Sequence, residues 1–65
     1  MEVINMHGAK INFEIATEMM DDNLREALHN EMAPCSEQAF FTEYEIQHEQ
    51  VFGEEWELSK ANPNY

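Results

Sequence analysis

The chain has 65 residues, with 14 Asp and Glu against three Lys and Arg, and its formal net charge at pH 7 is −11. This length allows one domain, residues 1–65. Nucleic acid and anionic membranes bind cationic side chains, of which the chain has few, so we expect no direct binding of either. The single cysteine excludes an internal disulfide, and no apolar run reaches the roughly 18 residues of a membrane span, so we expect a cytoplasmic protein.

The opening segment, residues 3–13, has the pattern of a short N-terminal β-hairpin. The pairs Val3-Ile4 and Lys10-Ile11 flank a turn that contains Gly8, and glycine readily takes the positive φ of a tight turn. Asn12 is expected to cap a first helix over residues 13–20, because its side chain can accept a hydrogen bond from an unpaired N–H of the first turn. One side of this helix carries Phe13, Ala16 and Met20.

A second helix is expected over residues 22–32. Asp21 or Asp22 caps it, and Asp21 is also placed to pair with Arg25 one turn later. Pro34 ends this helix, because the residue before a proline avoids helical backbone angles. One apolar stripe recurs at helical spacing and comprises Leu24, Ala27, Leu28 and Met32.

The third helix, residues 37–52, has the clearest periodicity. Ser36 is its expected N-cap, and Gly53 is expected to close it in a left-handed conformation. Its two faces differ in polarity, as in a helix that packs on a core. The apolar arc comprises Phe40, Phe41, Tyr44, His48, Val51 and Phe52, and the polar arc comprises Gln38, Thr42, Glu43, Glu45, Glu49 and Gln50.

Polar and apolar residues alternate over 54–58, which predicts a short extended segment that lays Trp56 and Leu58 on the core. The tail at about 60–65 has no periodicity, and we expect it to fray. The predicted fold class is therefore α+β, mainly α, with three helices, the hairpin and this extended segment.

No pattern in the chain indicates a reaction, a cofactor or a metal. The histidines and the cysteine are His7, His29, Cys35 and His48. They stand too far apart in sequence for the paired ligands that zinc sites use. Cys35 with His29 as base is the one nucleophile to consider, but a partly buried thiol in a helix connection is the simpler interpretation. A chain this short also rarely encloses a pocket of about 300 Å³. We predict a protein that is not an enzyme.

Carboxylates gather on the third helix and after it. The expected partner-binding residues are Glu43, Glu45, Ile46, Glu49, Glu54, Glu55 and Glu57. The glutamates predict a continuous negative ridge, with Ile46 as an apolar spot rimmed by charge, as many interfaces have. Such a ridge complements a basic protein surface whose Lys and Arg otherwise bind phosphates. The alternative, a solvated helix face that only keeps the protein soluble, stays open.

Four stretches of the chain, residues 12–14, 20–29, 33–35 and 48–55, resemble small acidic proteins of phages and prophages in Gram-positive bacteria. The resemblance carries over no site residues. It implies a setting in which such proteins are often inhibitors of host defence, such as anti-CRISPR proteins, or mimics of DNA charge.

Two hypotheses follow. The first is a non-enzymatic, phage-encoded inhibitor that works in the cytoplasm of the bacterial host and docks its acidic ridge on a basic, nucleic-acid-binding surface of a host protein. The alternative is an antitoxin-like or accessory regulatory subunit that binds a partner through apolar surface. Charge reversals disable the first kind of binding, and apolar truncations disable the second.

Overall fold

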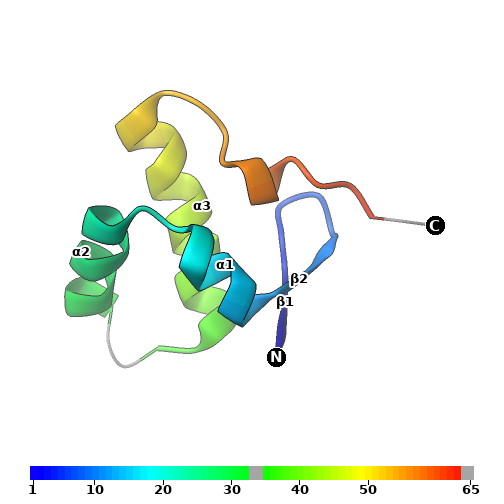
Figure 1. Cartoon of the computed structure of the whole chain (residues 1–65), viewed down its shortest axis with the longest axis horizontal. Coiled ribbons are helices and arrows are strands. Elements are labelled where there is room, and N and C mark those ends of the chain that lie inside the picture. Colours follow the sequence, from blue (N-terminus) through cyan, green and yellow to red (C-terminus); the bar gives the residue numbers. More distant parts are fainter. Residues whose placement is uncertain (33–34, 64–65) are drawn as a thin grey trace.

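The computed structural model of the chain describes residues 1–32 and 35–63. In chain order these form strands β1 (Glu2–Ile4) and β2 (Lys10–Asn12), helices α1 (Phe13–Met19), α2 (Asp22–Met32) and α3 (Glu37–Phe52), and a 3-10 helix (Glu57–Ser59) (Figure 1). α2 and β1 pack against α3, and α1 continues directly from β2. The predicted fold class, α+β and mainly α with an N-terminal hairpin, is confirmed.

β1 and β2 form the predicted antiparallel hairpin, in which Val3 stands opposite Ile11. Gly8 lies in the connecting turn with φ +88°, a left-handed conformation that costs glycine little. Val3 is 1% exposed, whereas its two neighbours in β1 are exposed. Because side chains alternate along a strand, one face of the hairpin closes the core and the other faces solvent.

The hairpin turn is held by the buried side chain of Asn5. Its oxygen accepts hydrogen bonds from the backbone N–H groups of His7 at 3.0 Å and Ala9 at 2.9 Å. Its amide nitrogen donates to the carbonyl oxygens of Leu58 and Ala61, each at 2.8 Å. One side chain thus satisfies the turn and joins it to the C-terminal segment.

The helix ends follow the predicted capping pattern. The side chains of Asn12 and Ser36 each accept a hydrogen bond at 3.0 Å from the backbone N–H three residues on, at the starts of α1 and α3. Gly53 closes α3 with φ +75°. α1 ends at Met19, one residue before the predicted end, while the bounds of α2 and α3 are those predicted.

The start of α2 confirms one prediction and corrects another. Asp21 is the cap, since its carboxylate accepts a hydrogen bond from the N–H of Leu24 at 3.0 Å. The predicted pair between Asp21 and Arg25 is wrong. The Arg25 guanidinium lies 3.2 Å from Asp22 and donates to the carbonyl oxygen of Thr17 at 3.0 Å. Capping occupies the Asp21 carboxylate, and Asp22 faces Arg25 three residues on.

Apolar side chains from the hairpin, all three helices and the C-terminal segment form the core. Its buried members are Val3, Ala16, Met20, Leu28, Phe40, Phe41, Tyr44 and Trp56. Tyr44 is 0% exposed, and its ring stands edge-on to that of Trp56 with the centroids 4.5 Å apart. Its hydroxyl oxygen accepts a hydrogen bond from the N–H of Asp21 at 2.8 Å. Burial raises the pKa of the Tyr44 hydroxyl, so the neutral form is favoured.

Two parts of the predicted apolar faces are not buried. Val51 and Phe52 are 58% and 47% exposed, and Ala27 on α2 is exposed as well. Figure 1 shows the last turn of α3 extending past α2. The expected burial of Val51 and Phe52 is therefore wrong. Helical spacing places both on the apolar arc of α3, but they lie beyond the elements that cover this arc.

The segment after α3 is only partly extended. Trp56 has extended backbone angles and is 3% exposed, as predicted, but residues 57–59 turn into the 3-10 helix. This turn buries Ser59 beside α3, while Leu58 packs against the core. Two expectations lie outside the described residues: the role of Pro34 as the end of α2, and the fraying of the last two residues of the tail.

Candidate protein-binding surface

The outer face of α3 presents Glu43, Ile46 and Glu49 in one line. Residues three apart are neighbours on a helix surface, so Ile46 lies between the two glutamates. Ile46 is 45% exposed, Glu49 is exposed and Glu43 is partly exposed. The carboxylate of Glu43 accepts a hydrogen bond from the Gln47 side chain at 3.1 Å. The structure thus brings together the apolar spot and its charged rim on this face.

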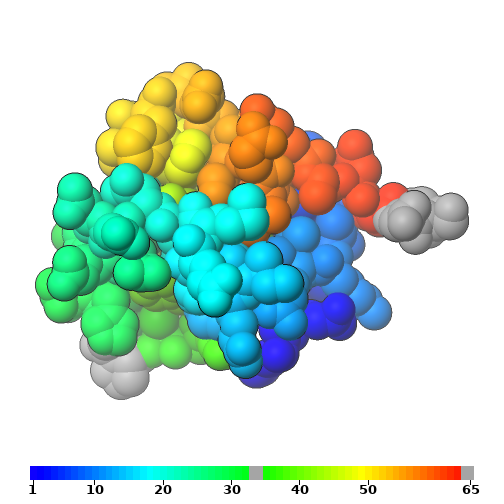
Figure 2. All heavy atoms as spheres, viewed as in Figure 1, coloured from blue at the N-terminus to red at the C-terminus, as the bar shows by residue number. Residues whose placement is uncertain are grey.

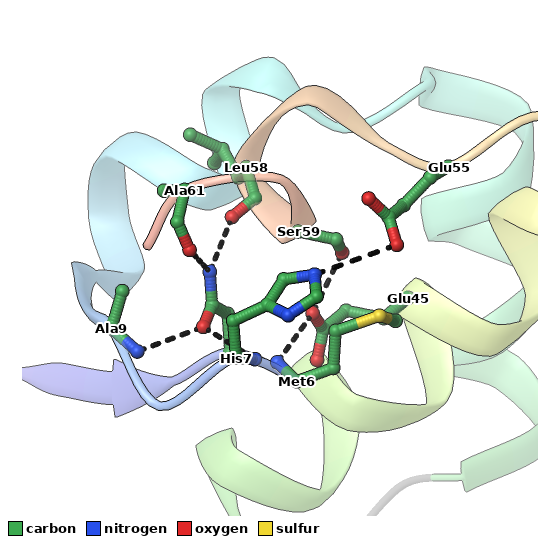
Figure 3. A network of polar contacts seen from close by, with 9 residues as sticks. Met6, His7, Ala9, Glu45, Glu55, Leu58, Ser59 and Ala61 are labelled. Carbon is green, nitrogen blue, oxygen red and sulfur yellow. Dashed lines mark hydrogen bonds and ion pairs between the residues drawn. The ribbon is translucent and has the colours of Figure 1, made fainter. Parts of the chain in front are cut away.

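Of the three glutamates after Gly53, Glu55 lies beside the hairpin turn, whereas Glu54 and Glu57 line a hollow next to Phe52. Glu54 and Glu57 are exposed. Glu57 pairs with Lys60 at 3.6 Å, and Glu55 faces the His7 ring at 3.7 Å (Figure 3). These pairs are solvent-exposed and therefore weak, so the carboxylates stay accessible to a stronger cationic partner. In Figure 2 the end of α3 and this segment form one continuous edge of the molecule.

Glu45 does not lie on this surface. It is 3% exposed, and its Oε2 accepts hydrogen bonds from the Ser59 hydroxyl at 2.6 Å and the Met6 N–H at 3.1 Å (Figure 3). Its expected place in a continuous ridge is wrong, because it joins α3 to the hairpin and the 3-10 helix from within. The spacing contains a signal for this: Glu45 follows the buried Phe41 by four residues, one helical turn.

An apolar hollow, which the sequence analysis missed, lies beside the carboxylates of Glu54 and Glu57. It has a volume of about 570 Å³, and its walls are formed by Met19, Tyr44, His48, Phe52 and Trp56, with Asp21, Glu54 and Glu57. Met19 and Phe52 are 48% and 47% exposed, and His48 Nδ1 lies 3.0 Å from the carbonyl oxygen of Glu54. Exposed apolar groups with a charged rim are typical of protein interfaces.

A second open cleft, of about 580 Å³, lies between α1, α2 and the start of α3. A chain this short is expected rarely to enclose a pocket of about 300 Å³, yet both openings exceed that volume, because neighbouring helices diverge at the surface. His29 and Cys35 both line this cleft. The structure therefore brings the one candidate base and nucleophile to the same cleft, but it shows no hydrogen bond that would activate the thiol among the residues it describes.

The negative charge of the chain is largely uncompensated. Within residues 1–32 and 35–63, Lys and Arg side chains form ion pairs with Asp22 and Glu57. Other exposed carboxylates lie on α1 and α2, at Glu14, Glu18, Glu26 and Glu31. The negative field therefore extends around the molecule rather than along one ridge, and it attracts a basic partner from many directions.

Among the described residues, no three His, Cys, Asp or Glu side chains are grouped so as to hold a metal ion. No helix in the same part of the chain is both long and apolar enough to cross a membrane. The absence of metal and of catalysis stays a prediction.

A comparison with known families finds one match over most of the chain. The family model described as anti-CRISPR protein AcrIC5 matches residues 4–56. This range contains β2 and all three α-helices and ends at the buried Trp56. No curated protein and no solved structure matches the chain.

Proposed function

The chain belongs to the AcrIC5 family of anti-CRISPR proteins, and on this premise we propose that it inhibits a CRISPR system by docking on a basic, nucleic-acid-binding surface of one of that system's proteins. The inhibitor acts in the cytoplasm of the bacterial host, as a binding protein and not as an enzyme. The docking residues, here called the acidic surface, are Glu43, Ile46, Glu49, Glu54, Glu55 and Glu57.

The observation that carries this proposal is the uncompensated charge at the C-terminal end of α3. A protein that binds nucleic acid holds phosphate groups with Lys and Arg side chains, and carboxylates satisfy the same donors in similar geometry. Glu49 and Glu54 are exposed without a Lys or Arg partner among the described residues. Their carboxylates can therefore take the place of phosphate groups on such a surface.

The buried Glu45 supports this surface from within. Its hydrogen bonds hold the hairpin and the 3-10 helix against α3, and Glu55 and Glu57 therefore keep a fixed position relative to Glu49. A surface that is held before binding loses less conformational entropy in the complex.

The second candidate is an accessory subunit that binds through apolar surface. The exposed Met19 and Phe52 at the apolar hollow favour it, since large exposed apolar side chains with a charged rim are frequent interface anchors. The two candidates differ in which side chains carry the binding energy, and this difference is measurable.

The test compares two variants with the same net charge. The first changes Glu54, Glu55 and Glu57 to Gln, and the control changes Glu14, Glu18 and Glu31, on α1 and α2, to Gln. Each variant is bound to the purified CRISPR effector complex of the host, and association and dissociation rates are measured at low and high salt. We expect the first variant to associate about tenfold or more slowly than the control, because local rather than total charge guides docking.

Two further measurements complete this test. Target DNA should compete with the protein for the effector complex, because both bind the same Lys and Arg side chains. Ile46→Ala should mainly raise the dissociation rate, as loss of a packed apolar contact does. Salt-independent rates, no competition by DNA and no difference between the two triple variants would rule out charge mimicry. A large loss with Phe52→Ala alone would then support the accessory subunit.

A further inference from the structure

The cleft between α1, α2 and the start of α3 is lined by a carboxylate of which one oxygen accepts no hydrogen bond from the described residues. Glu37, in the first turn of α3, lines the cleft, and its Oε1 is buried without a hydrogen-bond donor among residues 1–32 and 35–63. A buried carboxylate oxygen without a donor is unfavourable, because folding removes its water and supplies no hydrogen bond in return, although the positive end of α3 offsets part of this cost. A cationic donor in the cleft would remove this penalty if the Glu37 side chain rotated to turn this oxygen toward it.

The protein's own cation at the cleft is already engaged. Arg25 lines the cleft, but its guanidinium donates to the Thr17 carbonyl oxygen at 3.0 Å and contacts Asp22 at 3.2 Å. A second carboxylate, Glu26 on α2, also lines the cleft and is exposed. The cleft therefore presents two carboxylates, one occupied guanidinium and the His29 ring, and the two carboxylates favour a positive group from outside.

Aromatic rings form the other part of the lining. Phe13 from α1 and Phe40 from α3 stand edge to face, with centroids 6.4 Å apart and an interplanar angle of 83°. Phe40 is 8% exposed and Phe13 is partly buried, so both rings are fixed by the core. A guanidinium group is planar, weakly hydrated and stacks on aromatic faces, whereas an ammonium is a compact, strongly hydrated charge.

We propose that this cleft receives one arginine side chain of the CRISPR protein that the chain inhibits. The aliphatic part of the arginine lies against Phe13 and Phe40, and its guanidinium donates to Glu37, with Glu26 near the opening. The inference rests on the proposed function in one respect, namely that the target is a basic protein. It adds a second contact on the side of the molecule formed by α1 and α2 (Figure 1), apart from the acidic surface.

The first experiment needs no target. N-acetyl-L-arginine N-methylamide is titrated into the isotope-labelled protein, and amide chemical shifts are followed by NMR. We expect saturable shifts around Thr17, Glu37 and Phe40 with a dissociation constant in the millimolar range, as for a single side chain. Glu37→Gln should abolish saturation, whereas Glu31→Gln, an exposed α2 residue that does not line the cleft, should leave it unchanged.

The outcomes separate clearly. Shifts that are absent, that survive in Glu37→Gln, or that are equal for the norleucine analogue overturn the proposal. Equal binding of the corresponding lysine compound overturns the assignment to arginine. A thermal melt of Glu37→Gln confirms that the variant is folded, and Glu37→Asp, which keeps the charge on a shorter side chain, should bind the arginine compound more weakly than the unchanged protein but better than Glu37→Gln.

The second experiment distinguishes this contact from the acidic surface. Binding of Glu37→Gln to the host's CRISPR effector complex is compared with binding of the Glu54, Glu55, Glu57 triple variant. We expect Glu37→Gln to weaken binding about tenfold through faster dissociation, as loss of a desolvated charge pair does. If Glu37→Gln binds like the unchanged protein while the triple variant fails, the cleft proposal is wrong and the proposed function stands. If the triple variant binds normally and Glu37→Gln fails, the acidic surface is wrong and the cleft stands.

Discussion

Replacing the buried Glu45 by alanine should remove a large part of the stability of this protein. Glu45 Oε2 accepts hydrogen bonds from the Ser59 hydroxyl at 2.6 Å and from the Met6 N–H at 3.1 Å. The Met6 N–H lies in the hairpin turn and the Ser59 hydroxyl in the 3-10 helix. No residue of α3 next to Glu45 replaces the lost acceptor for these two donors. Alanine is the best helix former, and the change therefore costs α3 nothing in helix propensity.

The magnitude follows from the two donors. A hydrogen bond to a charged group contributes about 1.5–3 kcal/mol, and a buried donor left without a partner costs about 1–3 kcal/mol. Ser59 is 0% exposed, so its hydroxyl cannot turn to solvent, while the Met6 N–H is only partly buried. Removal of a buried charge offsets part of the loss. We expect the free energy of unfolding to fall by about 3 kcal/mol, out of a total of about 5 kcal/mol for a domain of this size.

The assay is urea unfolding followed by the fluorescence of Trp56, the single tryptophan of the chain, which is 3% exposed in the native state. Glu49→Ala is the matched control, because Glu49 stands four residues later on the same helix but is exposed. Its free energy of unfolding should change by no more than about 0.5 kcal/mol. Ser59→Ala completes a double-mutant cycle, in which the pair should show a coupling energy of at least about 0.5 kcal/mol.

A loss below about 1 kcal/mol in Glu45→Ala, or additive effects of Glu45→Ala and Ser59→Ala, would refute the structural role of this carboxylate. Glu45 would then return to the candidate partner-binding residues. A binding measurement at a temperature at which Glu45→Ala stays folded gives a second check. Support from within predicts a smaller loss of binding than in the Glu54, Glu55, Glu57 triple variant, whereas direct contact with the partner predicts a comparable loss.

Four further predictions concern Tyr44 in the core and the side chains considered as a nucleophile or as metal ligands. Tyr44→Ala should lower the free energy of unfolding by about 3 kcal/mol or more, as large aromatic truncations do, and a loss below about 1 kcal/mol in urea unfolding would contradict its central place. Burial raises the pKa of Tyr44 in the folded state, so its contribution to stability is fully present below the unfolded pKa of about 10 and is lost as the pH rises through the folded pKa. Urea unfolding should therefore show a free energy of unfolding that falls between pH 8 and pH 11. Tyr44→Phe should lack this fall. Cys35→Ser should leave inhibition in a phage-infection assay unchanged, and a complete loss in a folded variant would restore the nucleophile hypothesis. Elemental analysis should find no stoichiometric zinc, and unfolding on addition of a chelator would instead identify ligands among His7, His29, Cys35 and His48.

The acidic surface could be predicted only in part from the sequence. Glu43, Ile46 and Glu49 stand three residues apart, and helical geometry alone places them side by side. The positions of Glu54, Glu55 and Glu57 depend on the path of the chain after Gly53, which brings Glu55 to His7 of the hairpin turn and the other two to the hollow at Phe52. The apolar hollow at Phe52 and the unpartnered oxygen of Glu37 depend on how neighbouring helices overlap along their lengths. No local sequence pattern predicts this overlap.

Local chemistry determined the secondary structure. Asn12, Asp21 and Ser36 are short polar side chains that accept a hydrogen bond from the first turn of a helix, and Gly53 takes the left-handed angles that end one. These signals act over three or four residues, and for that reason the bounds of α2 and α3 follow from sequence alone.

Only the tertiary structure decided which of these faces meet. Glu45 is buried because its Oε2 accepts hydrogen bonds from donors 39 and 14 residues away in the chain, and Val51 is exposed because the last turn of α3 extends past α2. A helical wheel gives the direction of a side chain but not the partner in that direction. Burial and charge pairing each depend on two segments of the chain. The sequence of one segment does not specify where the other segment lies in space.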